Sequence, residues 1–102
     1  MIVLKFGGTS VGDLNRVRDA AAIIEAQPKP RAAVVSAASG VTNLLLEAAA
    51  AAAHGAVGRA EQVAQTIREK HLLIVSGVSD EAERAAAVAE LDQLHAALDD
   101  AL

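Results

Sequence analysis

The sequence Lys5-Phe6-Gly7-Gly8-Thr9-Ser10-Val11-Gly12, which directly follows the apolar run Ile2-Val3-Leu4, decides the fold of this chain. Two of the three aliphatic residues are β-branched, and an aromatic residue and paired glycines follow. The pattern therefore predicts a short buried strand that breaks into a tight turn. A helix capped by Asp13 or Ser10 is expected next, because apolar residues follow at helical spacing. They are Leu14, Val17, Ala20, Ala21 and Ile24.

The glycine pair is suited to binding an anion. Without Cβ atoms, the backbone amides at Gly7 and Gly8 can come close to a ligand. Phosphate is favoured, because Lys5 would add a positive charge and the hydroxyls of Thr9 and Ser10 can donate to phosphate oxygens. The spacing matches neither the P-loop nor the Gly-x-Gly-x-x-Gly dinucleotide motif. An ordinary strand-to-helix turn with a solvated lysine therefore remains the alternative.

A second strand and a second turn of small residues follow. The segment Gln27-Pro28-Lys29-Pro30 predicts the end of the first helix, because proline cannot continue a helix. Residues 32–37 are apolar and β-branched at their centre, which predicts a buried parallel strand and a right-handed βαβ unit. The turn over residues 36–43 should then lie beside the first turn, because parallel strands end at the same edge of a sheet. Open α/β sheets bind ligands at that edge.

Helices are expected over the rest of the chain. One runs from Leu44 to about His54 through six consecutive alanines and ends at Gly55 and Gly58. Another begins near Arg59 and continues to about residue 75, although a strand over residues 71–77 is an alternative.

The last helix is expected to begin at Ser79 or Asp80 as its cap, with acidic residues in its first turn. Its apolar positions form a seam that needs a partner helix. They are Val88, Leu91, His95, Leu98 and Leu102. Residues 60–102 therefore predict a helical hairpin whose loop lies near residues 77–80.

The composition excludes several classes of function. The 102 residues suffice for one small domain or a piece of a larger one. Acidic and basic residues are mixed, the net charge is −4 and Phe6 is the only aromatic residue, so nucleic-acid binding is not expected. Absence of cysteine excludes disulfides and thiol chemistry. No apolar segment is long enough to span a membrane, so we expect a soluble cytoplasmic protein without a membrane partner.

The two turns together resemble a known family. Residues 5–11, followed by Val35-Ser36-Ala37-Ala38-Ser39-Gly40-Val41-Thr42-Asn43, look like the start of an aspartokinase, a member of the amino acid kinase superfamily. Related kinases of glutamate, carbamate or uridylate share the lysine and glycines, but the Thr-Ser-Val and Gly-Val-Thr-Asn continuations resemble aspartokinases. The resemblance covers nearly the whole chain. It implies part of the α/β amino acid kinase (carbamate kinase-like) fold: two parallel strands with βα units, followed by a helical hairpin.

The resemblance also implies an activity. Aspartokinases use ATP and Mg²⁺ to phosphorylate the β-carboxylate of L-aspartate, giving 4-phospho-L-aspartate and ADP, the first step toward lysine, threonine and methionine. Such a reaction asks mainly for positioning and charge compensation. No general base is needed, because the carboxylate is already ionised at neutral pH. A homo-oligomer is expected for the full-length enzyme.

Roles for individual residues follow from their motif positions. Lys5 would contact the transferring phosphoryl group as the catalytic residue, and Ser36 would lie near the phosphates and the substrate. Thr42 would help to hold aspartate, or would merely cap the helix that follows; Ser39 and Asn43 are candidate caps only. The phosphate-binding segment would consist of Lys5, Phe6, Gly7, Gly8, Thr9 and Ser10. No residue is assigned as a metal ligand.

An aspartokinase continues with further strands, a Ser-Phe-Gly-Glu-like motif, the nucleotide-base pocket and ACT domains. The resemblance therefore implies that residues 1–102 are the amino-terminal part of a catalytic domain, inactive when isolated. A non-catalytic phosphate-binding or helix-mediated interaction module is the main alternative, and a kinase of the same superfamily for another small acid is the second. A metal site at His54, His71 and His95 is a third, although their spacing matches no ligand pattern.

Overall fold

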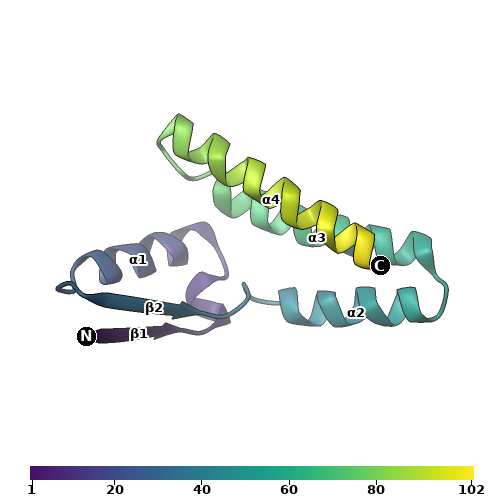
Figure 1. The fold of residues 1–102 in the computed structure, drawn as a ribbon, viewed down its shortest axis with the longest axis horizontal. Coiled ribbons are helices and arrows are strands. Elements are labelled where there is room, and N and C mark those ends of the chain that lie inside the picture. The colour runs from purple at the N-terminus through teal and green to yellow at the C-terminus, as the bar shows by residue number, and fades with distance from the viewer. The chain divides into compact units, whose positions relative to one another are not determined.

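Two parallel strands and four α-helices make up the computed structural model, which describes all of residues 1–102 (Figure 1). In chain order the elements are β1 (Ile2–Phe6), the short 3₁₀ helix η1 (Gly8–Val11), α1 (Leu14–Glu25), β2 (Arg31–Val35), α2 (Val41–Ala53), α3 (Val57–Val75) and α4 (Glu81–Ala101). They divide into two compact units, Met1–Thr42 and Asn43–Leu102, and the division falls in the first turn of α2. No helix is both long and apolar enough to cross a membrane.

The first unit is the predicted βαβ unit. β1 and β2 pair in parallel, in a register that runs from Ile2 opposite Arg31 to Phe6 opposite Val35. Helix α1 connects them and lies along one face of the strands (Figure 1). Of the two candidate caps, Asp13 is the one used: its Oδ1 accepts a hydrogen bond from the Arg16 amide at 2.9 Å. The prolines at 28 and 30 follow the end of α1, as expected.

The sheet is less buried than the sequence predicts. Phe6 on the α1 side is only 8% exposed, but Val3 is 65% exposed and Val34 is 53% exposed. The prediction of a buried second strand is therefore wrong, and that of a buried first strand holds only for Phe6, because Ile2 and Leu4 are half-buried and Val3 is exposed. One cause is that a single helix covers these two strands, so side chains on the far face have no apolar layer against them. Val35, which pairs with Phe6 in the register, is 57% exposed as well, so α1 does not cover the end of β2 on its own side either.

The second unit is helical, and α3 and α4 form the predicted hairpin (Figure 1). Its most buried residues are small or β-branched, and all lie on α2 and α3: Ala48, Ala60, Val63, Ala64 and Ile67. Asp80 caps α4 by accepting the Glu83 amide at 2.8 Å. Two ion pairs join the helices, Arg59 with Glu47 between α3 and α2, and Arg68 with Asp92 between α3 and α4.

Several predicted boundaries require correction. Helix α2 begins at Val41 instead of Leu44, so Thr42 and Asn43 lie inside its first turn and neither is its N-cap. Gly55, with φ +76°, follows the end of α2 as expected, but Gly58 belongs to the first turn of α3. Helix α3 continues to Val75, which makes the alternative strand over residues 71–77 wrong. The apolar run there continues a helical periodicity that no breaker interrupts.

Candidate functional site

The loops after β1 and β2 lie against each other at the carboxyl edge of the sheet. The Ser36 amide donates to the Phe6 carbonyl oxygen at 3.1 Å, which extends the strand pairing into the second loop. A Cβ atom added at Gly8 would lie 3.0 Å from the Ala37 carbonyl oxygen and 3.7 Å from the Ser36 Oγ. The first loop therefore packs on the second through its backbone, and the predicted juxtaposition of the two turns is confirmed.

Gly7 differs from Gly8, because no atom beyond its two chain neighbours lies within 4 Å of a Cβ atom added there. Its φ of −76° and ψ of 175° describe extended backbone that any residue adopts. Neither crowding nor backbone conformation therefore requires glycine at this position within the chain. The open space leaves the backbone at Gly7 accessible to a ligand.

Two amides next to Gly7 could donate to such a ligand. The first hydrogen bond of η1 runs from the Ser10 amide to the Gly7 carbonyl oxygen at 3.0 Å. The amides of Gly8 and Thr9 precede it, so helix geometry leaves them without an acceptor inside η1. Paired backbone donors beside an exposed glycine suit a phosphate oxygen.

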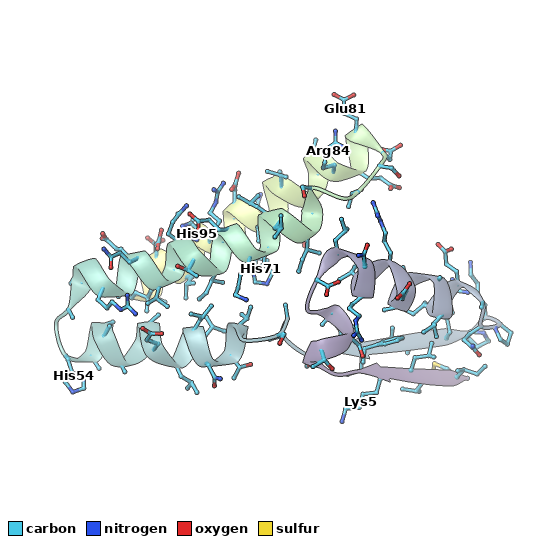
Figure 2. The ribbon with its side chains drawn as sticks, turned by 180° about the vertical axis from the view of Figure 1, so that it is seen from behind. Lys5, His54, His71, Glu81, Arg84 and His95 are labelled. Atoms are coloured by element: carbon cyan, nitrogen blue, oxygen red, sulfur yellow. The ribbon has the colours of Figure 1, made fainter.

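Lys5 and Phe6 occupy opposite faces of β1. The Lys5 side chain is exposed, and Figure 2 shows it extending away from α1. The Phe6 ring is buried and lines a cavity of about 160 Å³ together with Ser10 and residues of α1, among them Ala20. Lys5 thus supplies a positive charge on the open face of the sheet, whereas the Phe6 ring lies under the loop on the face that packs against α1.

The hydroxyl residues differ in exposure. Thr9 and Ser36 are exposed, whereas Ser10 is half-buried and faces the cavity beside Phe6. The Ser36 Oγ has only a long 3.5 Å contact with the Ala37 carbonyl oxygen, so this hydroxyl is not strongly engaged within the chain. Thr42 is exposed in the first turn of α2. Lys5, Gly7, Gly8 and Ser36 are therefore brought to one sheet edge, and Thr42 lies in the first turn of the helix that follows it.

Sequence reasoning gave no role to Gly12 and considered Ser39 only as a cap. A Cβ atom added at Gly12 would lie 3.0 Å from the Ser39 Cβ and 3.3 Å from the Gly8 carbonyl oxygen. Gly12 is therefore a second point of close approach between the loops. Its spacing of four residues from Gly8, across a single turn of η1, is the signal that could have indicated this contact.

The donors in the two loops do not fit a directly held Mg²⁺ ion. Asp13 is their only carboxylate, and it already accepts the Arg16 amide as the cap of α1. Protein-bound Mg²⁺ in kinases is typically held by one or two carboxylates together with substrate phosphates. Hydroxyls, amides and a lysine suit the phosphates themselves.

The three histidines make contacts within their own segments and do not converge. His54 Nδ1 lies 2.7 Å from the Ala50 carbonyl oxygen, and His71 Nδ1 lies 2.8 Å from the Ile67 carbonyl oxygen. His95 Nε2 lies 3.2 Å from the Asp99 Oδ2 one helical turn away. Figure 2 shows the three side chains at separate places along the helices. No group of three or more histidine, cysteine or acidic side chains could hold a metal ion.

Comparison with known proteins connects these loops to one family. The model of the amino acid kinase family matches residues 1–101. An aspartokinase of Chlamydia muridarum is 46% identical over 70 residues, which are 69% of this chain and 15% of that protein. A Haemophilus influenzae protein, named as an inactive aspartokinase 3, is 43% identical over 81 residues, 76% of this chain and 58% of that protein.

A solved structure has the same fold. The crystal structure of Escherichia coli aspartokinase III, in complex with lysine and aspartate, matches 99% of this chain with a TM-score of 0.70 and 25% identity. The match covers 22% of that chain. This chain therefore spans only part of the length of the relatives to which it is similar.

Proposed function

Because this chain belongs to the amino acid kinase family, we propose that it forms the phosphate-binding start of an aspartokinase. The proposed reaction transfers the γ-phosphoryl group of ATP to the β-carboxylate of L-aspartate. Residues 1–102 are proposed as the amino-terminal part of the catalytic domain of a longer enzyme that assembles as a homo-oligomer. The identity of 46% with an aspartokinase supports this choice within the family.

The observation that carries the proposal is the contrast between Gly7 and its neighbours. A Cβ atom added at Gly8 or at Gly12 would come within 3.0 Å of an atom of the second loop, whereas a Cβ atom added at Gly7 would face open space. No contact within the chain requires glycine at position 7, and the amides of Gly8 and Thr9 and the exposed Lys5 lie close to it in the sequence. Close approach of a phosphate requires such an arrangement.

Each residue then has a role in the transfer. A carboxylate oxygen of aspartate attacks the γ-phosphorus, the bond from that phosphorus to the β–γ bridging oxygen breaks, and ADP leaves with the electron pair. No proton needs to move, because both the nucleophile and the leaving group are anions. Lys5 compensates the negative charge of the transferring group, and the amides of Gly8 and Thr9 hold phosphate oxygens. Ser36 and Thr42 orient the phosphates and the aspartate from the second loop and α2.

In this proposal Mg²⁺ is bound by the phosphates of ATP and not by residues of the two loops. Mg²⁺ supplies neutralisation of phosphate charge when it is bound to ATP. Since the loops offer no uncommitted carboxylate, the chain's own residues hold the nucleotide and not the ion.

Grafting tests the proposal in a complete enzyme. Residues 1–101 replace the structurally matching segment of Escherichia coli aspartokinase III, and ADP formation is measured with and without aspartate. We expect aspartate-dependent ADP formation, and Lys5→Ala should lower kcat by about 100-fold, the usual cost of losing one stabilising group for transition-state charge. Lys29→Ala, an exposed lysine outside both loops, is the matched control and should leave kcat unchanged.

The same graft separates this proposal from the related kinases. Glutamate and carbamate are offered in place of aspartate, and neither should be phosphorylated at a comparable rate. A folded graft that forms no ADP with aspartate, or whose kcat survives Lys5→Ala, would contradict the proposal.

A non-catalytic phosphate-binding module is the second candidate. One observation favours it: a relative of which the chain covers 58% is named as an inactive aspartokinase. This candidate predicts that the natural product of the gene binds MgATP but forms no ADP with aspartate. Turnover by that product that is abolished by Lys5→Ala would exclude it.

A further inference from the structure

The contact between Gly12 and Ser39 is the second place where the two loops of the proposed site meet. Unlike the contact at Gly8, it lies at the far end of η1, one turn away from the open space at Gly7. The Gly12 amide and Cα join η1 to Asp13, which is fixed as the cap of α1 by its bond to the Arg16 amide. One end of η1 is therefore held by a rigid helix start.

The room available at this contact is small. A methyl group at residue 12 would lie 3.0 Å from the Ser39 Cβ, closer than ordinary van der Waals contact between carbon atoms. Since the Asp13 cap holds the first loop, the displacement would fall on Ser39 and the second loop. That loop is short: Ser36 is tied to β1 through the Phe6 carbonyl oxygen, and Gly40, with φ 83°, turns the chain into α2.

We propose that Gly12 and Ser39 are a size-matched pair of positioning residues that sets how closely the second loop approaches the phosphate-binding loop. A shift of Ser39 is transmitted along Ala37 and Ser36, whose atoms lie against Gly8. The pair touches no phosphate itself. It fixes the separation between the amides of the first loop and the Ser36 hydroxyl of the second, and so determines whether both reach one phosphate group. This inference rests on the proposed function, because it takes the first loop to be the phosphate-binding loop.

The test uses four variants of this chain: Gly12→Ala, Ser39→Gly, Gly12→Ala with Ser39→Gly, and Gly12→Ala with Ser39→Ala. MgATP affinity, the free energy of unfolding and the amide resonances of Gly7 and Gly8 are measured for each. Gly12→Ala should weaken MgATP binding by about fivefold, because a displacement of a few tenths of an ångström is smaller than the 1 Å that can cost about 100-fold. It should also shift both amide resonances.

Removal of the Ser39 Cβ should restore the MgATP affinity of Gly12→Ala to within about twofold of that of the unsubstituted chain. It should also return the amide resonances of Gly7 and Gly8 to their positions in the unsubstituted chain. Ser39→Ala keeps the Cβ and removes only the hydroxyl, so it should not restore either. Losses that simply add in the double variant would overturn the proposal. So would a Gly12→Ala chain that is destabilised but binds MgATP unchanged, because the contact would then be structural only.

Failure of the proposed function gives a different result. If the unsubstituted chain does not bind MgATP, the phosphate-binding role is contradicted while the amide resonances still report the loops. If the amide resonances of Gly7 and Gly8 in Gly12→Ala with Ser39→Gly return to their positions in the unsubstituted chain, the size-matched pair is supported independently of any ligand. If they do not return to those positions, the pair is overturned.

Discussion

The two units of this chain bury their apolar side chains in different ways. The unit Met1–Thr42 buries two larger side chains, Phe6 and Val41, and leaves Val3 and Val34 more than half exposed. The unit Asn43–Leu102 is built on alanine, with Ala48, Ala60 and Ala64 almost completely buried. Small side chains let helices approach closely, so this unit forms a core on α2 and α3 without an aromatic residue. Leu46, Leu73 and Leu94 nevertheless remain more than 60% exposed.

The shapes of the two units have different physical origins. In the helical unit, the small volume of the buried side chains along α3 sets how closely the helices approach each other. In the strand unit, the loops are placed by backbone contacts at Gly8 and Gly12, and the sheet beneath them is covered on one face. The proposed site is on the unit with the thinner core, so its geometry depends on few contacts, and single substitutions there should have separable effects.

Truncation of Phe6 should have the largest effect. Phe6→Ala is expected to destabilise the strand unit by about 3 kcal/mol, near the lower end of the usual range because the ring is slightly exposed. Val34→Ala, on the exposed face, should cost less than about 0.5 kcal/mol. Amide hydrogen exchange measured residue by residue reports the free energy of opening for each unit. Equal losses for the two variants would mean that the Phe6 ring is not the core of this unit.

Enlargement of Ala64 tests the opposite property in the helical unit. Ala64 is 0% exposed, so Ala64→Leu should overpack the contact between helices and destabilise this unit by about 2 kcal/mol. Ala86→Leu, on an exposed position of α4, makes the same change in helix propensity without crowding and should be within about 0.5 kcal/mol of neutral. Urea unfolding followed by circular dichroism measures both. An Ala64→Leu chain as stable as Ala86→Leu would contradict a closely packed alanine core.

The smallest predicted effect concerns the turn between α2 and α3. Gly55 has φ +76°, so Gly55→Ala should destabilise the helical unit by about 1 kcal/mol. Gly58 lies in α3 with open space around a Cβ, so Gly58→Ala should stabilise it by about 0.5 to 1 kcal/mol. Thermal unfolding of the two variants should therefore move in opposite directions. An unfolding midpoint for Gly55→Ala that is unchanged or raised would show that the turn does not require a left-handed residue.

The fold was predictable from local sequence in its main elements. Prolines 28 and 30, Asp13 and Asp80 marked helix ends through chemistry that acts within one turn, and the βαβ unit and the hairpin are confirmed. Exposure of β2 was not predictable, because a run such as Ala32-Ala33-Val34-Val35 fits a strand covered on either one or both faces. How many layers cover a strand is set by distant parts of a chain.

The candidate site was predictable in its position but not in its detailed contacts. Parallel pairing alone places the loops after β1 and β2 at one edge, as expected. The sequence does not distinguish Gly7, which faces open space, from Gly8, which lies against Ala37, because that distinction depends on where the second loop sits. The same dependence hid the contact of Gly12 with Ser39. The roles of Lys5, Ser36 and Thr42 stay predictions.

Titration of the ¹⁵N-labelled chain with MgATP tests the central claim most directly. The amide resonances of Gly7, Gly8 and Thr9 should shift most, with smaller shifts over residues 36–40 and none in α3 or α4. Lys5→Ala should weaken these shifts at each nucleotide concentration. Shifts that are largest in the helical unit, or no shifts at any concentration at which the chain stays folded, would contradict a phosphate site on the strand unit.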